Sequence, residues 1–373
     1  MAELQVRPFT FTLLRELSAE HFTSGTVLAA KHGVSRSAVS DALKQASALG
    51  VQIFSLTRRG YRLAEPLQLL DIDVIRQRMS ANGAGNGNSA GNGNSAGSGN
   101  GASSGNGASG GNVAKGANSA SQHRLDLRLV DVIDSTNTAL LNQATSGAAS
   151  GTCLAAELQT AGRGRRGRVW QSALGASLTF SLLWRFESGA ASLGGLSLAV
   201  GLAVANALRA LGIDAELKWP NDIVVDDQKL GGILIETQGD MLGPTVAVIG
   251  VGLNMRLSDA LRLAIDQPVT DIATVSAAAA VTSPALNRNI LLPAILSRLV
   301  MVLDQFQQGG FGVLRDQWRA LHAHQGCMVD VHAATESYVA KVIDVSEDGG
   351  LIVERDGKRL SLTAVEISVR RSR

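Results

Sequence analysis

The residues with the clearest chemical potential form the run Gly162-Arg163-Gly164-Arg165-Arg166-Gly167-Arg168, which is followed directly by Val169 and Trp170. Arginine keeps its charge near neutral pH, and its planar guanidinium group matches the oxygens of carboxylates and phosphates. Glycine has no side chain and lets the backbone approach a ligand closely. The run therefore predicts a flexible loop that closes over a small anion.

The same run fits other kinds of loop less well. Gly162-x-Gly164-x-x-Gly167 satisfies the dinucleotide fingerprint, but that fingerprint needs a helix at its third glycine, and a predicted strand follows here. A Walker phosphate loop would end in Gly-Lys-Ser or Gly-Lys-Thr. Both nucleotide-binding loops are therefore excluded by context. A nucleic-acid-binding arm and a merely solvated basic loop remain open.

A second cluster is Lys218-Trp219-Pro220-Asn221-Asp222. A predicted strand ends at the lysine, and the proline breaks the ladder and turns the chain. Asn221 and Asp222 can lock this turn through side-chain-to-backbone bonds, or Asp222 can hold a metal ion. Lys218 could bridge a carboxylate and a phosphate oxygen, or it could simply pair with Asp222. Glycine-containing strands follow at 229–236 and 250–255, where the backbone can line a pocket.

A third cluster, Asp134-Ser135-Thr136-Asn137, follows the strand predicted at Asp126–Val132. Ser135 and Thr136 could cap the next helix. They could also exchange hydrogen bonds with a neutral polar ligand group such as a urea or an amide.

The elements before these clusters predict a winged helix-turn-helix domain at residues 1–66. Helices are expected at Phe9–Ser18, Gly25–His32 and Arg36–Ala48, the last capped by Ser35 after a turn at Gly33. Strands at Val51–Leu56 and Tyr61–Leu63 complete a basic wing. Protein contacts are the alternative to DNA binding for such a domain. The side chains expected to face DNA are Arg36, Ser37, Ser40 and Lys44 on the recognition helix and Arg58 and Arg59 on the wing.

Residues 81–112 consist only of Ala, Gly, Asn and Ser, which cannot bury enough apolar surface to order the backbone. The sequence therefore predicts a connecting helix at 67–80 and a disordered tether at 81–122 that divides the chain in two. A catalytic domain at 123–324 should follow, with strands and helices alternating in a mixed sheet but without regular βαβ units. Its long helices are expected at Leu193–Leu211 and Leu291–Gln307. Short strands at 325–373 predict a small β-barrel.

The bulk composition is typical of a soluble cytoplasmic protein without membrane partners. The net charge of +2 means that any nucleic-acid contact must come from a local patch. Cys153 and Cys327 predict neither a disulfide nor a metal cluster. His322-x-His324 comes nearest to a metal-ligand spacing, but two exposed imidazoles at a helix end explain it better, so no metal site is expected. The apolar stretch Leu193–Leu211 is better explained as a buried core helix than as a membrane span.

Together, the motifs resemble those of the biotin–protein ligases, in the same order along the chain. The matching segments are Ser135-Thr136-Asn137, Glu157-x-Gln159, Ala161–Arg168 with Trp170, Lys218–Asp222, Lys229-Leu230-x-Gly232-Ile233-Leu234 and Gly250-x-Gly252-x-Asn254. The N-terminal winged helix makes the chain similar to the bifunctional bacterial type, which is also the biotin operon repressor. The resemblance implies an α+β multidomain fold with a ligase domain of the biotin/lipoate type and a C-terminal SH3-like barrel.

The resemblance also implies a two-step reaction. Biotin and Mg-ATP would give biotinyl-5′-adenylate and pyrophosphate, and biotin would then pass to a lysine of the biotin carboxyl-carrier protein of acetyl-CoA carboxylase. No protein nucleophile is needed, because fixed cations can position the two anionic reactants and offset their repulsion. A loop that orders on binding would also keep water from the adenylate. The adenylate-bound protein would form a homodimer and bind operator DNA.

The resemblance assigns the site residues by function. Those implied in biotin binding are Ser135, Thr136, Asn137, Gln159, Arg163, Gly164, Arg165 and Lys218. Those implied in binding ATP or the adenylate are Arg165, Arg166, Arg168, Lys218, Asn221 and Asn254. Lys218, Arg163 and Arg165 are the implied catalytic residues, with biotin, ATP and Mg²⁺ as ligands.

Two departures from the family pattern stand out. The predicted tether is long, which puts rigid coupling between the domains in doubt, and no aromatic residue lies at 267–270 to cover an adenine. A ligase with a vestigial winged helix and a ligand-sensing repressor without catalysis both remain alternatives. Lys218 argues against the latter, because a sensor of free biotin has little use for a bridge between carboxylate and phosphate.

Overall fold

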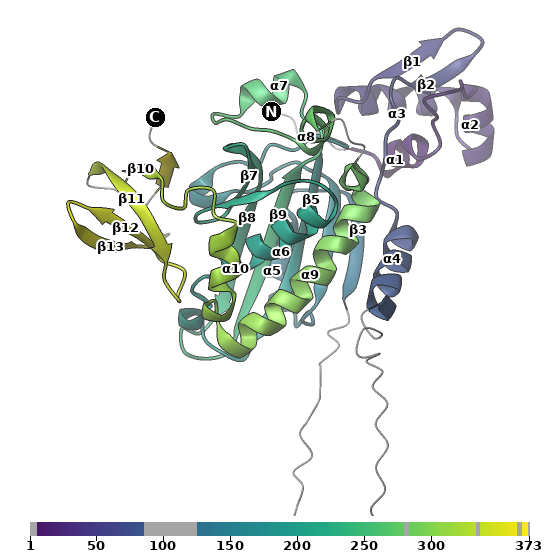
Figure 1. Cartoon of the computed structure of the whole chain (residues 1–373). Helices are drawn as coiled ribbons and strands as arrows, with labels where there is room; N and C mark the ends of the chain where they lie inside the picture. Colours follow the sequence, from purple (N-terminus) through teal and green to yellow (C-terminus); the bar gives the residue numbers. More distant parts are fainter. Residues whose placement is uncertain (1–5, 86–124, 280–282, 333–335, 364–367, 372–373) are drawn as a thin grey trace, which may run out of the picture.

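The computed structural model describes residues 6–85, 125–279, 283–332, 336–363 and 368–371. They form a winged helix, a central sheet covered by helices, and a small C-terminal sheet (Figure 1). Residues 86–122 of the predicted tether lie outside the described residues. This layout confirms the predicted α+β multidomain fold class.

The N-terminal part has the predicted helix-turn-helix and wing. Its elements are α1 (Pro8–Leu14), α2 (Gly25–His32), α3 (Arg36–Ala48), β1 (Ile53–Leu56) and β2 (Gly60–Leu63). The Ser35 side chain caps α3 by accepting from the Ala38 amide at 3.1 Å, and Gly33 ends α2 with a φ of +63°. The first helix ends at Leu14, earlier than predicted, because the chain turns there and Leu17 enters the core.

The central part is a seven-stranded mixed sheet with the strand order β3-β4-β5-β9-β8-β7-β6. Its strands are β3 (Asp126–Ile133), β4 (Thr152–Gln159), β5 (Ser177–Phe186), β6 (Glu216–Lys218), β7 (Asp222–Val225), β8 (Gln228–Gly239) and β9 (Thr245–Asn254). β3 and β4 are parallel and joined through α5 (Thr136–Thr145), whereas the other neighbours are antiparallel. The sheet is therefore mixed and lacks the regular βαβ pattern, as the sequence predicts.

Two long helices cover one face of this sheet, and α5 covers the other. α6 (Leu196–Ala210) and α9 (Arg288–Gly309) cross in front of the strands in Figure 1 and pack into the main hydrophobic core. α9 is long and apolar enough to span a membrane by length and composition, but 56% of that stretch is buried inside the protein. We therefore interpret both apolar helices as core helices.

α4 (Ile72–Gly85) begins later than predicted and continues through residues 81–85, where the tether was expected to start. It packs against α9, and its Ile75 is fully buried in the main core. The Arg76 side chain donates to the carbonyl of Leu127 at the start of β3. Leu174, between β4 and β5, is buried in the hydrophobic cluster of the winged helix. The parts before and after the predicted tether therefore share their hydrophobic cores.

Short helices and a second sheet complete the chain. They are α7 (Asp259–Ala264), α8 (Ile272–Ala278), α10 (Arg315–Ala320), β10 (Met328–His332), β11 (Ser337–Val345), β12 (Leu351–Arg355), β13 (Lys358–Leu362) and β14 (Ser368–Arg371). The last five strands form an antiparallel sheet in the order β13-β12-β11-β10-β14.

The two histidines between α10 and β10 are buried, not exposed as predicted. The chain pairs with β6 here, since the Leu217 amide donates to the carbonyl of Leu321 at 2.8 Å. The His322 ring lies 4.5 Å from the ring of Trp318, and His324 lies 3.5 Å from a carboxylate oxygen of Asp227. Among the described residues, no group of three or more His, Cys, Asp or Glu side chains could hold a metal ion.

Candidate active site

A cavity of about 1250 Å³ lies where several strands of the central sheet begin or end, and the three predicted clusters meet in its walls. All twelve side chains or glycines predicted to bind biotin or ATP line it. They are Ser135, Thr136, Asn137, Gln159, Arg163, Gly164, Arg165, Arg166, Arg168, Lys218, Asn221 and Asn254. The predicted DNA-facing residues lie apart, on the winged helix.

One end of the cavity is polar and buried. Ser135 caps α5 by accepting from the Thr138 amide, so its capping role and a place in the cavity wall coexist. Gln159 at the end of β4 accepts from the Thr136 amide at 2.8 Å. Gly250 lies so close to the Asn137 side chain that any added Cβ would overlap the Asn137 amide oxygen. These groups offer hydrogen-bond partners to a neutral, compact ligand head.

The arginine loop is closed on itself by main-chain bonds. The Gly164 amide donates to the Arg168 carbonyl at 2.7 Å, and the Trp170 amide donates to the Gly162 carbonyl at 2.9 Å. Arg166 and Gly167 turn the chain with φ values of +58° and +71°. The loop therefore holds four cationic side chains on a tight turn at the cavity.

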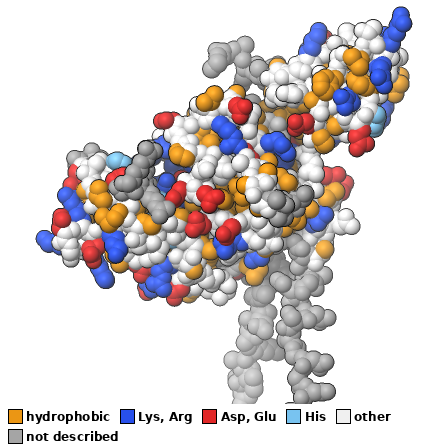
Figure 2. Space-filling view, turned by 45° about the horizontal axis from the view of Figure 1, so that its top comes forward, with side chains coloured by type: hydrophobic (Ala, Val, Ile, Leu, Met, Phe, Trp, Pro, Cys, Tyr) orange, Lys and Arg blue, Asp and Glu red, His pale blue; other side chains and the backbone are white. Residues whose placement is uncertain are grey.

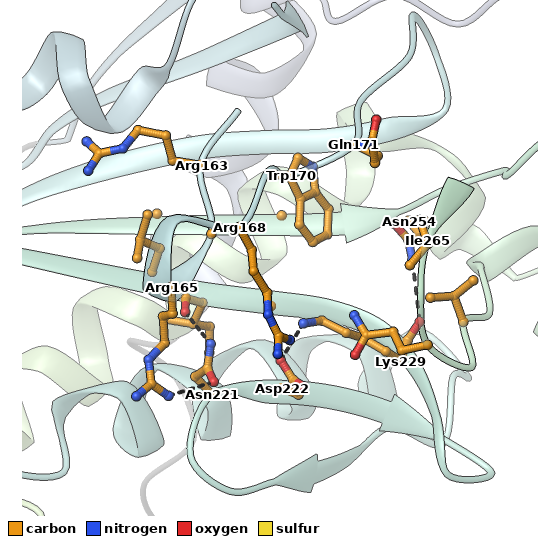
Figure 3. Close-up of a pocket in the computed structure, with 18 of the residues that line it drawn as sticks. Arg163, Arg165, Arg168, Trp170, Gln171, Asn221, Asp222, Lys229, Asn254 and Ile265 are labelled. Carbon is orange, nitrogen blue, oxygen red and sulfur yellow. Dashed lines mark hydrogen bonds and ion pairs between the residues drawn. The ribbon is translucent and has the colours of Figure 1, made fainter. Parts of the chain in front are cut away.

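The arginine side chains leave this turn in different directions (Figure 3). Arg165 donates to the Asn221 side-chain oxygen at 3.0 Å, and Arg168 extends toward Asp222 and Lys229. Arg163 points away from them and pairs with Glu236 at 2.8 Å. Burial, and then repulsion from Arg166, lower the pKa of the Arg165 guanidinium below its usual value. A bound anion would offset both the cost of burying the Arg165 charge and its repulsion from Arg166.

Two lysines and one aspartate line the middle of the cavity. Lys218 ends β6 and lies opposite Asp222 of β7 across the Trp219-Pro220 turn. Asp222 forms an ion pair with Lys229 at 2.6 Å. Sequence motifs alone give Lys229 no binding role, because the sequence does not reveal which cation meets which carboxylate.

The cavity wall also contains an aromatic ring. The Trp170 indole lies on the backbone of Gly252, where an added Cβ would come within 2.6 Å of the ring. Asn254 donates to the carbonyls of Thr270 at 3.0 Å and Lys229 at 3.4 Å, so its amide nitrogen holds the loop that carries Pro268 and Val269. Trp170 is thus an aromatic residue of the cavity wall, whereas residues 267–270 contain none.

The winged helix projects from the body and carries Lys and Arg side chains on its outer surface (Figure 2). On α3, Arg36, Ser37 and Lys44 are exposed and Ser40 is partly exposed. Arg58 and Arg59 are exposed in the wing turn, and the Arg59 guanidinium lies 5.2 Å from the ring centre of Phe22. Part of the wing's charge is therefore held in place by an aromatic ring.

Comparison with known proteins agrees with this arrangement. Residues 129–254 match the biotin/lipoate A/B protein ligase family, and residues 10–62 match the HTH domain. The chain is 32% identical to the bifunctional ligase/repressor BirA of Salmonella typhimurium over 360 residues, covering 96% of this chain and 97% of that protein. It is 31% identical to the biotin--[acetyl-CoA-carboxylase] ligase of Paracoccus denitrificans, covering 63% of this chain and 96% of that protein.

Among solved structures, the biotin protein ligase from Aquifex aeolicus in complex with biotin and ATP is similar, with a TM-score of 0.56 and 26% identity. The match covers 66% of this chain and 99% of that protein. The near-complete coverage of the Salmonella protein includes both the winged helix and the ligase core. This chain belongs to the biotin–protein ligase family, in its bifunctional ligase/repressor branch.

Proposed function

We propose that this chain is an ATP-dependent biotin–protein ligase that also acts as a biotin-responsive repressor. One observation carries the ligase assignment: buried polar side chains, several cations and an aromatic ring line a single cavity. These three features suit the head, the acyl phosphate and the adenine of biotinyl-5′-adenylate.

In the first step, a carboxylate oxygen of biotin attacks the α-phosphorus of Mg-ATP, and the bond to pyrophosphate breaks. Both reactants are anions, so their approach is opposed by charge repulsion. Lys218, Lys229 and Arg165 are positioned to bind the carboxylate and phosphate oxygens, which lowers this repulsion and fixes the line of attack. Mg²⁺ enters as part of the nucleotide substrate.

The head and the adenine are held by different groups. Thr136, Asn137 and Gln159 bind the ureido ring of biotin in the polar end, and the Trp170 indole packs against the adenine. The arginine loop covers the acyl phosphate and keeps water from this reactive anhydride. The side chain of Asn254 contributes indirectly, by holding the loop that carries Pro268 and Val269 in the cavity wall.

In the second step, the amine of a carrier-protein lysine attacks the acyl carbon, the acyl–phosphate bond breaks, and AMP leaves. The attacking nitrogen must lose a proton as the amide forms. Asp222, held by Lys229, is a carboxylate in the same cavity that can accept it. The carrier proposed is the biotin carboxyl-carrier protein of acetyl-CoA carboxylase, and the site of action is the cytoplasm.

Repression would follow from the same intermediate. Adenylate-bound protein forms a homodimer and places two winged helices on one operator, which supplies the contact area that a single helix-turn-helix lacks. Arg36, Ser37, Ser40 and Lys44 contact the groove, and Arg58 and Arg59 contact phosphates.

The ligase assignment is tested by incubating the protein with biotin, Mg-ATP and an isolated carrier domain. Biotin should become covalently attached to the carrier, and a carrier whose acceptor lysine is changed to arginine should remain unmodified. Absence of biotin on the unmodified carrier would contradict the assignment.

Repression is tested by a gel shift on the promoter of the biotin-synthesis genes, with and without biotin plus ATP. A shift only with both ligands supports adenylate-dependent repression. No shift in either condition would leave a ligase with a vestigial winged helix.

A further inference from the structure

Glu236 of β8 lies beside the cavity and makes two polar contacts with different parts of the site. One carboxylate oxygen pairs with the Arg163 guanidinium at 2.8 Å, and the other accepts from the Asn137 amide nitrogen at 3.0 Å. Arg163 belongs to the arginine loop, whereas Asn137 belongs to the polar end of the cavity. A single side chain, 21% exposed, therefore joins the loop to the wall of the head pocket.

The contacts around Glu236 fix the direction of a hydrogen-bond chain. A carboxylate can only accept, so the nitrogen of the Asn137 amide must face Glu236, and its second hydrogen points to the Leu234 carbonyl at 3.3 Å. The Asn137 oxygen then faces the Ser181 hydroxyl at 2.5 Å, which must donate to it. The Thr136 hydroxyl lies 2.7 Å from the Ser181 hydroxyl and also donates to the Gln159 amide oxygen at 3.1 Å, so its one hydrogen faces two acceptors.

This order leaves one acceptor position on the Asn137 oxygen and no donor on its nitrogen. The buried Asn137 side chain can thus offer a ligand only an acceptor, which suits the N–H of a cyclic urea and not its carbonyl. The polarity of this wall depends on the charge of Glu236, because a side chain that could donate would allow the amide to turn over.

The same contact changes the role expected for Arg163. Its guanidinium is directed to Glu236 and to the Thr138 hydroxyl at 3.4 Å, away from Arg165 and Arg168 (Figure 3). The contact attaches the start of the arginine loop to β8, an interior strand of the central sheet.

We propose that Glu236 is a positioning residue with two effects: it latches the arginine loop through Arg163, and it sets the Asn137 amide to accept the ureido N–H of biotin. This inference rests on the proposed function for the identity of the ligand. The contacts of Glu236 with Arg163 and Asn137 do not depend on that identity.

Trypsin is a suitable probe of the latch, because the loop contains four arginines and cleavage requires local opening. In ligand-free protein, Glu236→Ala and Arg163→Ala should each speed cleavage after Arg165, Arg166 and Arg168 by about tenfold, the effect of one charge-assisted hydrogen bond. The double variant should be cleaved no faster than the single ones, because both remove the same contact.

Ligand measurements separate the two effects. Both variants should release preformed biotinyl-adenylate about tenfold faster than the wild type. Only Glu236→Ala should also raise the KM for biotin, because only it frees the Asn137 amide. Glu336→Ala breaks the comparable surface pair between Arg355 and Glu336 in the C-terminal sheet and should change neither measurement.

Unchanged trypsin cleavage in both variants, with normal adenylate formation by the wild type, would overturn the latch. An unchanged KM for biotin in Glu236→Ala would overturn the effect on Asn137. Failure of the wild type to form any adenylate would instead contradict the proposed function, so the two failures are distinguishable.

Discussion

The guanidinium of Arg288 donates to the carboxylate of Glu157 at 2.7 Å, and both side chains are 2% exposed. Arg288 also donates to the carbonyl of Gln68, and Glu157 accepts from the amide of Leu70. Asn289 donates to the Leu69 carbonyl at 3.0 Å. One buried ion pair thus holds the main chain that follows the winged helix against the start of α9 and the strand β4. The winged helix is therefore attached to the ligase core by contacts that do not pass through residues 86–124.

Breaking this buried pair from one side should be strongly destabilising. Arg288→Met leaves the Glu157 charge buried without its partner and should lower the free energy of unfolding by about 3–5 kcal/mol. Adding Glu157→Gln to Arg288→Met should recover part of that loss, since the uncompensated charge is removed. Urea unfolding of the single and double variants gives these values. A loss below about 0.5 kcal/mol for Arg288→Met would show that the pair does not join the two parts.

Two glycines on β9 should separate biotin binding from nucleotide binding. The added methyl of Gly250→Ala would meet the Asn137 amide, whereas that of Gly252→Ala would meet the Trp170 ring. Overpacking typically costs about 1–3 kcal/mol, so each should raise one KM by roughly tenfold to a hundredfold. Gly250→Ala should act on the KM for biotin and Gly252→Ala on the KM for ATP. Each variant is the control for the other, and a reversed or shared effect would contradict the assignment of Asn137 to biotin and of Trp170 to the adenine.

Arg165 should matter more to the adenylate than Arg166. Arg165 is partly buried and bonded to Asn221, and its burial already lowers its pKa, whereas Arg166 is exposed on the turn. Arg165→Gln should therefore speed adenylate release by more than about tenfold, and Arg166→Gln should change it by less than about threefold. Stopped-flow dissociation of the adenylate measures both. Equal effects would indicate that the loop acts only through its total charge.

The buried His322 predicts a loss of stability in acid. Burial, and then the neighbouring His324, lower the pKa of the His322 imidazole to about 3. The unfolded chain therefore binds a proton below about pH 6.5 that the folded protein does not bind. Above pH 6.5, His322 therefore does not lower the free energy of unfolding. Between pH 6.5 and 3 the free energy of unfolding falls as the pH drops, by at most about 1.4 kcal/mol per pH unit from this residue.

His322→Phe keeps a ring against Trp318 but cannot take up the proton. Between pH 6.5 and 4, its unfolding free energy should fall less steeply than that of the wild type. The difference in slope isolates His322 from the other titrating groups. Parallel curves for the two proteins would contradict the assignment of this pH dependence to His322.

The parts of the fold with local signals could be predicted from the sequence. Ser35 and Gly33 mark the helix-turn-helix through a cap and a left-handed turn, and both act within a few residues. The packing of α4 on α9 could not be predicted, because Ile75 and α9 meet only in the folded core. The low-complexity segment between α4 and α9 suggested that the parts of the chain before and after it are separate. The contacts that join those parts are made by residues outside that segment.

In the candidate site, too, the residues could be predicted from the sequence but their contacts could not. Residue types and motif order indicated which residues line the cavity, since anionic ligands need arginine and lysine and close approach needs glycine. The partners of those residues were not predictable from type. Asp222 pairs with Lys229, and Arg163 pairs with Glu236, because strand register and loop direction decide which charges face each other.

The central claim is that biotin is activated as an adenylate between the two lysines of this cavity. Biotin-dependent exchange of labelled pyrophosphate into ATP tests it most directly, because exchange requires reversible adenylate formation and no carrier protein. The wild type should exchange label only when biotin is present. Lys218→Ala and Lys229→Ala should each lose at least about a hundredfold in rate while retaining the thermal unfolding profile of the wild type. Exchange without biotin, or at the wild-type rate in both variants, would contradict the account.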